Sequence, residues 1–456
     1  MRALLFIALA LISSAPHAGP ALMKPDGLQM AFAADRSSLT GGPDAYDVQI
    51  AIEGENGGLL TGGLFERWWG CEIAPLSGGE TLRCTVVNFT SADLILPVWS
   101  TSTDGETFTA PARIPGEVVD NLMAQPQEAY DFTVAVPDGV THVRLWKYFP
   151  YTIDDKLALL ASLPPADPEG PVRFSGPIGE STEGRPIEMI ELSRGADDAG
   201  KHRVWIHSGI HCAETTSYFV VEGLIDFLLN SGEPDAQRVL ERCIIDVVPM
   251  LNPDGVARGN YRASAPNPPS RPGGTDMEFH FGDRGEWQSS FSECQTVMDQ
   301  IRRWNGTPPE PPTANPVEVI LNLHATHEEP FPTHYQHSPT YPPTGVLPAV
   351  HALEGVWIDA FKGRSPDFVG RGTTLVSRLG SRSTVEGWAH DLYPANAAHD
   401  GPPIMAITYE ASYQGGPVDA RWNTADDYRQ NGREMALALL DYFDRLESGA
   451  VPPGRH

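Results

Sequence analysis

Short runs of alternating apolar and polar residues fill the chain from about residue 28 to residue 143. Gly, Asn and Asp, which favour turns, separate these runs. The runs read YDVQIAIEG, LRCTVVNF, LILPVWSTSTDGETF, YDFTVAVPDG and HVRLWKYF. Because a period of two buries one face of each strand, the pattern predicts an antiparallel β-sandwich, which we place at residues 22–163.

The pattern changes after LPPADPEGP, a proline-rich linker at residues 163–171. Beyond it, apolar runs that read as buried strands alternate with helical stretches. The runs lie at 203–209, 244–249, 317–325 and 403–413, and the helical stretches at 216–230 and after the cap residues Asn423 and Thr424. This alternation is typical of an α/β fold with a largely parallel sheet, and we place this second domain at residues 170–448.

A strongly acidic composition narrows the classes of partner. The 456 residues include 32 Lys and Arg against 59 Asp and Glu, a formal net charge of −27. Such a charge repels polyphosphate, so we expect no nucleic-acid partner. We also expect no membrane span, because no segment approaches the roughly 20 apolar residues that a spanning helix needs. Small molecules, peptides and glycans remain as partners.

The N-terminus, MRALLFIALALISSAPHAGPA, combines one positive charge at Arg2 with an apolar stretch at 3–12 and small residues through Ala21. This order is typical of a secretory signal peptide. We therefore assign residues 1–21 to a signal peptide and expect a secreted or periplasmic protein.

His211 and Glu214 directly follow the predicted strand RVWIHSG. Three residues apart at a strand end, they can turn an imidazole nitrogen and a carboxylate toward one point, which suits Zn²⁺. An HxxE motif alone also fits a solvated helix start, where Glu214 would complement the helix dipole. His324, at the end of VEVILNLHA, reaches the same edge of the sheet and is our third ligand. His327, His334 and His337 follow in a proline-rich stretch, where no strand geometry positions them.

Two further residues suit the chemistry of such a site. Glu410 ends the otherwise apolar run AITYEAS, and a buried carboxylate is either paired with a cation or functional. Arg262 closes NPDGVARGNYR, whose Asn252-Pro253-Asp254-Gly255 reads as a turn. A base for water and a cation for an oxyanion are what zinc-dependent hydrolysis requires besides the metal.

SxxGRPI, HxxE, VPMLNPDGVARGNYR, a histidine at a strand end and YEAS occur here in one order. In this combination the chain resembles the zinc carboxypeptidases, specifically their cytosolic carboxypeptidase-like subfamily. The resemblance implies an α/β/α catalytic domain with a mixed, mainly parallel sheet. It also implies that His211, Glu214 and His324 bind one Zn²⁺, that Arg262 polarises the scissile carbonyl and that Glu410 is the general base. Asp276, in GTDMEFHF, matches the aspartate that orients the first zinc histidine.

One departure from the family pattern concerns the substrate. The family has Asp-Leu-Asn-Arg, whose Asn and Arg hold the substrate's terminal carboxylate, whereas this chain has Asp276-Met277-Glu278-Phe279. Glu278 and Phe279 are therefore candidate substrate-binding residues that would disfavour a carboxylate. Alternatively, Arg271 or Arg284 supplies the missing charge, and a second register would align Asp283-Arg284 with the motif at the cost of the Asp276 match.

The sequence is compatible with three functions. The leading one is a zinc metallopeptidase that hydrolyses a peptide through activated water and recognises the substrate's C-terminus atypically. An N-acyl amino-acid deacylase would use the same kind of fold and zinc site. A pseudo-peptidase that only binds its ligand is the third, and zinc content together with turnover separates it from the other two.

Overall fold

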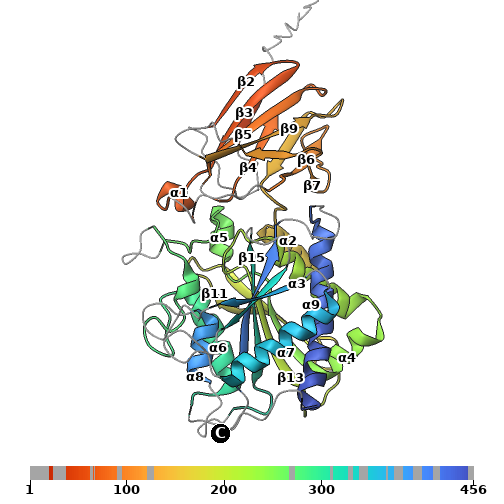
Figure 1. Ribbon diagram of the computed structural model, residues 1–456, viewed down its shortest axis with the longest axis vertical. Helices are drawn as coiled ribbons and strands as arrows, with labels where there is room; N and C mark the ends of the chain where they lie inside the picture. Colours follow the sequence, from red (N-terminus) through yellow and green to blue (C-terminus); the bar gives the residue numbers. More distant parts are fainter. Residues whose placement is uncertain are drawn as a thin grey trace, which may run out of the picture.

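The computed structural model describes residues 20–23, 37–61, 65, 67–89, 95–120, 128–266, 273–308, 312–326, 332–337, 348–365, 368–373, 384–393, 403–413 and 422–449. Three β-sheets organise this part of the chain, two in its N-terminal part and a larger one in its C-terminal part (Figure 1). Most of the expected signal peptide, residues 1–19, lies outside the described residues, and Ala21 belongs to the first strand.

Two five-stranded sheets face each other in the N-terminal part. One has the order β1-β4-β10-β6-β7, formed by Ala21–Met23, Gly70–Ala74, His142–Trp146, Val98–Ser102 and Ala112–Arg113. The other has the order β2-β3-β5-β9-β8, formed by Ser38–Gly42, Ala45–Ala51, Thr81–Phe89, Glu128–Ala135 and Val118–Asp120. All neighbours run antiparallel except β3 and β5. The two sheets bury one shared core, in which Trp69 Nε1 donates a 2.8 Å hydrogen bond to Tyr130 Oη. The predicted β-sandwich is confirmed.

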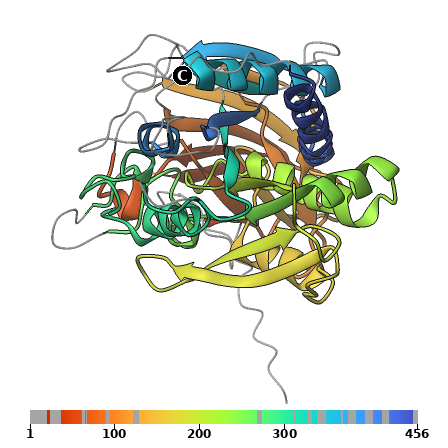
Figure 2. The same ribbon diagram turned by 90° about the horizontal axis from the view of Figure 1, so that it is seen from below.

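The C-terminal part is built on an eight-stranded mixed sheet. Its order is β11-β12-β14-β13-β15-β18-β16-β17, formed by Val172–Glu180, Pro186–Leu192, Cys243–Val248, His202–Ser208, Val317–Thr326, Met405–Ser412, Thr333–His337 and Val369–Thr373. The central strands β14, β13, β15 and β18 run parallel. In Figure 2 the antiparallel pair β11 and β12 (yellow) lies on the opposite side of the molecule from α7 (cyan).

Helices cover both faces of this sheet, which makes the α/β/α arrangement that the resemblance implies. One face carries α3 (Thr216–Asn230), α4 (Pro234–Arg242), α7 (Pro348–Arg364) and α9 (Ala425–Glu447). The other carries α6 (Ser292–Asn305) and α8 (Val385–Leu392). Strand β13 shows why both faces must be covered: Val204 and Ile206 enter the first core and Trp205 the second.

Helices α3 and α9 approach each other unusually closely because each offers a glycine at the crossing. A Cβ added to Gly223 would lie 2.0 Å from the carbonyl oxygen of Arg429, and one added to Gly432 would lie 2.0 Å from that of Val220. The start of α9 agrees with the predicted cap, since Thr424 Oγ1 accepts a hydrogen bond from the Asp427 N–H.

Helix α2 (Ile153–Ser162) joins the two parts. Its first turn is capped by Thr152 and Asp155, and Lys156 forms a buried 2.6 Å ion pair with Glu188 on β12. Although α2 falls within the first expected domain, it therefore packs against the second. Among the helices that the structure describes, none has the length and apolar character needed to cross a membrane.

Candidate active site

The carboxyl edge of the parallel strands brings together segments that are far apart in the chain. Strand β13 ends at Ser208, and Gly209 turns the chain toward His211 with a φ of 73°. A Cβ at this position would lie 2.3 Å from the ring of Tyr218, so the turn requires glycine. Strand β14 leads to Asn252, which caps α5 (Pro253–Arg258) by accepting the Gly255 N–H, so the expected turn is a helix start. The Asn252 side-chain amide also contacts the carbonyl oxygens of Ile210 and Ala263.

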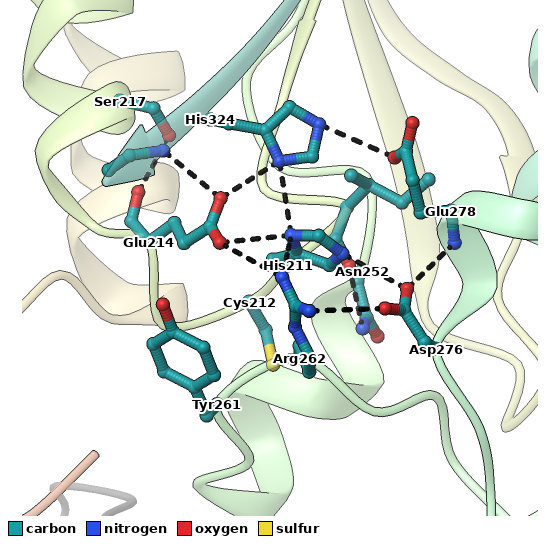
Figure 3. Close-up of polar contacts among 12 residues, drawn as sticks. His211, Cys212, Glu214, Ser217, Asn252, Tyr261, Arg262, Asp276, Glu278 and His324 are labelled. Carbon is teal, nitrogen blue, oxygen red and sulfur yellow. Dashed lines mark hydrogen bonds and ion pairs between the residues drawn. The ribbon is translucent and has the colours of Figure 1, made fainter. Parts of the chain in front are cut away.

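His211, Glu214 and His324 converge on one point (Figure 3). The two Nδ1 atoms lie 3.0 Å apart, and each lies 2.9 Å from an oxygen of Glu214. All three side chains are buried, and Glu214 Oε2 also accepts the backbone N–H of Ala325. Burial acts to raise the pKa of Glu214, but the two histidines hold it well below its usual value. Glu214 precedes α3 and is not a solvated helix residue.

A single turn, the 3-10 helix Met277–Phe279 that follows Asp276, presents two carboxylates to the far sides of these histidines. Asp276 Oδ1 lies 3.0 Å from His211 Nε2, and Glu278 Oε2 lies 3.3 Å from His324 Nε2. Burial favours the neutral form of Asp276, but His211 and Arg262 hold its pKa well below the usual range. Each Nε2 therefore has a carboxylate partner, while each Nδ1 points to the centre.

Arg262 directs its guanidinium group into the same centre. Its Nη2 lies 3.1 Å from His211 Nδ1 and 3.6 Å from Glu214 Oε1, and its Nη1 lies 3.3 Å from Asp276 Oδ2. Its Nε is buried without a hydrogen-bond partner among the described residues. The two Nη groups thus provide directed N–H donors at the edge of the cluster.

Glu410 lies on β18 and is the register partner of His324 on β15. Its Oε2 is buried and has no hydrogen-bond partner in the part of the chain that the structure describes. Burial foremost, and then the nearby charge of Glu214, raise the pKa of Glu410 to about 8. A carboxylate with so high a pKa binds a proton readily near neutral pH, and a cation beside it would lower that pKa.

The three candidate substrate-binding residues are in different surroundings. Glu278 is buried, and its Oε1 accepts a 3.1 Å hydrogen bond from Asn322 Nδ2. Phe279 is half-buried at the end of the same turn. Arg284 is exposed on a separate turn, where its Nε donates to Ser290 Oγ. Arg271 and His327 lie outside the described residues.

In the alternative register, Asp283 would take the position beside His211. The structure places Asp276 there, whereas Asp283 lies 3.0 Å from His280 Nδ1 and accepts the Ser290 N–H.

His334 and His337 lie on strand β16, and not in a loop as expected, and their side chains contact residues outside the His211–Glu214–His324 cluster. His334 is fully buried, and its Nε2 accepts a 3.1 Å hydrogen bond from Trp357 Nε1. His337 forms a second close cluster with Glu354 and His390, which the sequence did not indicate. His337 Nδ1 lies 2.6 Å from Glu354 Oε1, and its backbone N–H donates to Glu354 Oε2, so this ion pair accounts for both carboxylate oxygens.

Sequence reasoning also missed Glu55 and Asn56, which the β-sandwich inserts beside Arg262. Glu55 accepts hydrogen bonds from the backbone N–H groups of Tyr261, Arg262 and Ala263. The only signal for them is a polar pair in a glycine-rich stretch, ENGG, which by itself reads as an exposed turn.

An α/β/α fold with two histidines and a glutamate at the carboxyl edge defines a class, the metallohydrolases of carboxypeptidase type. The family model for zinc carboxypeptidases matches residues 174–333. The chain therefore contains a zinc carboxypeptidase domain, which confirms the resemblance predicted from its motifs, and this family implies a zinc cofactor.

Curated relatives and solved structures agree with this assignment. Cytosolic carboxypeptidase 6 of Mus musculus is 33% identical over 117 residues, which are 25% of this chain and 20% of that protein. Cytosolic carboxypeptidase 2 of Mus musculus is 27% identical over 161 residues, 34% of this chain and 18% of that protein. The matches thus span about a fifth of these relatives. The metallo-carboxypeptidase of Burkholderia cenocepacia shares the fold, with a TM-score of 0.69 at 19% identity over 94% of this chain and 100% of that one.

The expectation of a secreted or periplasmic protein is wrong, because the curated relatives are named as cytosolic enzymes. All five cysteines of the chain are free and buried. The expectation of export rested on an apolar stretch behind one positive charge and followed by small residues, and the names of the relatives contradict it.

Proposed function

We propose that the protein is a zinc-dependent hydrolase of peptide bonds with one catalytic zinc ion. One observation carries this proposal: His211, Glu214 and His324 converge within hydrogen-bond distance of one another, with Glu410 on the neighbouring strand and Arg262 at the edge of the cluster. Two imidazole nitrogens and one carboxylate are a donor set that zinc prefers in catalytic sites. A packing role would not explain two histidine Nδ1 atoms that both face one carboxylate in a buried space.

Zinc, when bound, supplies a Lewis acid that polarises a carbonyl oxygen and lowers the pKa of water. The protein's own residues do the rest. Glu410 takes a proton from water as the water oxygen attacks the carbonyl carbon, and it then gives that proton to the leaving amide nitrogen as the C–N bond breaks. Arg262 donates N–H groups to the carbonyl oxygen, whose negative charge grows in the transition state. Asp276 holds His211 in the orientation that leaves Nδ1 free for the metal.

Recognition of the substrate's C-terminus is atypical in this proposal. In the sequence motif, Glu278 and Phe279 stand where the family has the Asn and Arg that hold a substrate carboxylate. Asn322 Nδ2 lies between Glu278 and a second buried carboxylate, Glu386, at 3.1 Å and 3.0 Å. The excess of negative charge on this side favours a substrate that presents a cationic or neutral group. The alternative, in which Arg271 or Arg284 binds the carboxylate, predicts the opposite preference.

A second candidate is an N-acyl amino-acid deacylase, which would use the same kind of fold and zinc site. Both reactions break an amide bond with the same residues, so only the products distinguish them.

Mass spectrometry of products tests the proposal. The zinc-loaded protein would be incubated with peptides that have free, amidated and D-residue C-termini and with N-acyl amino acids, and Glu410→Gln would be the control. We expect cleavage of the peptides by the wild type alone, with Lys-ended and amidated peptides preferred over Glu-ended ones. Cleavage of N-acyl amino acids alone would establish the second candidate, and zinc binding without any turnover would establish a pseudo-peptidase. A preference for Glu-ended peptides would assign the carboxylate to Arg271 or Arg284.

A further inference from the structure

The N-terminal β-sandwich reaches the candidate active site through two adjacent residues. Glu55 lies more than 200 positions from Arg262 in the sequence, yet its Oε1 accepts the backbone N–H groups of Tyr261 and Arg262 at 3.1 Å and 2.9 Å. Its Oε2 accepts the N–H of Ala263 at 2.5 Å. One carboxylate thus binds three consecutive N–H groups of the segment that carries Arg262.

Asn56 extends the same contact. Its backbone N–H donates to Asn260 Oδ1, and Asn260 Nδ2 donates back to Asn56 Oδ1, both at 2.9 Å. Its Nδ2 donates to the carbonyl oxygens of Ser264 and Gly273 at 3.0 Å and 2.9 Å. Asn56 adopts these contacts with a φ of 52°, a conformation that non-glycine residues rarely take.

The side chains of Glu55 and Asn56 are both buried where they contact the catalytic part of the chain. Glu55 is 2% exposed and Asn56 7%. A buried carboxylate is costly unless hydrogen-bond donors surround it, and here the three donors all come from the catalytic part of the chain. The contact therefore stabilises one relative position of Glu55 and residues 261–263.

The same segment connects to the metal ligands. The carbonyl oxygen of Tyr261 accepts the N–H of Ala213, which lies between His211 and Glu214. Glu55 thus binds one side of the segment, and the HxxE turn binds the other. A displacement of this backbone would move the Arg262 guanidinium relative to both histidine ligands.

We propose that Glu55 and Asn56 are positioning residues, which hold the backbone of residues 260–264 so that Arg262 points at the carbonyl oxygen of the substrate. This inference rests on the proposed function, because it acts through Arg262. In this proposal the β-sandwich contributes to catalysis because it contacts residues 260–264, and it does not contact the substrate.

The test is a double-mutant cycle on the zinc-loaded, full-length protein. Glu55→Gln keeps the side-chain volume but turns one acceptor into an amide N–H₂ that faces backbone donors. Asn56→Gly removes the side-chain bonds and tolerates the positive φ, so it serves if Glu55→Gln does not fold. Glu53→Gln, two residues away, is the matched control. Each is measured for kcat, KM, zinc content and thermal midpoint, alone and combined with Arg262→Ala.

We expect Glu55→Gln and Asn56→Gly to lower kcat about tenfold or more with KM changed less than about threefold, because small displacements of a transition-state donor affect mainly kcat. Zinc content should stay at the wild-type value, and Glu53→Gln should match the wild type. In the Arg262→Ala background, the same substitutions should lower kcat less than about twofold. Equal losses in both backgrounds would overturn the inference while leaving the proposed function intact. Full activity of Arg262→Ala would overturn both the inference and the role of Arg262.

Discussion

His324 and Glu410 are register partners on the parallel strands β15 and β18. Because equivalent positions of adjacent parallel strands project their side chains to the same side, this register brings the proposed metal-ligating imidazole of His324 and the carboxylate of Glu410 to one edge of the sheet. The backbone hydrogen bonds between β15 and β18 thus position both the proposed metal ligand and the proposed base.

Replacing Glu410 by Gln should separate metal binding from catalysis. The amide has nearly the same volume but cannot accept a proton from water, so we expect unchanged zinc content and a loss of kcat of about 10²–10⁴-fold. Elemental analysis and steady-state kinetics check the two parts. Activity within tenfold of the wild type would remove Glu410 from the mechanism.

His324→Ala should release the metal while the fold persists. In the proposed site the His324 ring is one of three protein ligands, so its loss leaves only two. We expect less than a tenth of the wild-type zinc by elemental analysis, with an unchanged far-ultraviolet circular dichroism spectrum. His327→Ala is the control that retains zinc. The opposite result in these two variants would move the third ligand to His327.

Glu278→Gln tests whether the carboxylate beside His324 supports metal binding. Removing the charge 3.3 Å from His324 Nε2 should weaken the orientation and basicity of this ring, so we expect zinc affinity to fall about 10–100-fold. Glu386→Gln is the matched control, because Glu386 shares the Asn322 amide with Glu278. Competition with a chromophoric chelator measures both affinities. Equal affinities would assign Glu278 to the substrate alone.

The free energy of unfolding should decrease in acid because His334 is buried in its neutral form. Burial lowers the pKa of His334 to about 3, whereas an unfolded histidine has a pKa near 6.5. Above pH 6.5 the group is neutral in both states and contributes no pH dependence. Between pH 6.5 and 3 only the unfolded state gains the proton, so the free energy of unfolding decreases as the pH falls.

At pH 4.5 this effect should reach about 2–3 kcal/mol for His334 alone. Urea unfolding of the metal-free protein at pH 7 and pH 4.5 measures it, since metal release then contributes nothing. His334→Gln lacks the titrating group, so its stability should change less over this interval than that of the wild type. The same pH dependence in both proteins would contradict the prediction.

The sequence by itself determined the parts that depend on local periodicity. Alternation with a period of two identified the sandwich strands, and continuous apolar runs identified the buried strands of the α/β part. Because parallel strands present their carboxyl ends at one edge, the positions of His211, His324 and Glu410 at strand ends were enough to predict that they meet. The apolar N-terminus, in contrast, indicated export wrongly, since a short hydrophobic stretch carries little information about its destination.

Only the tertiary structure decided which groups surround that edge. The sequence Asp276-Met277-Glu278-Phe279 does not say whether Glu278 faces substrate or His324, because one turn of backbone can present it to either; the fold places it beside His324. Nor could any local pattern connect Glu55 with Arg262, since a hydrogen bond between residues more than 200 positions apart depends on how two separately folded layers dock. The local sequence pattern thus specifies which residues lie at the carboxyl edge of the sheet. Packing between distant segments specifies which groups those residues contact.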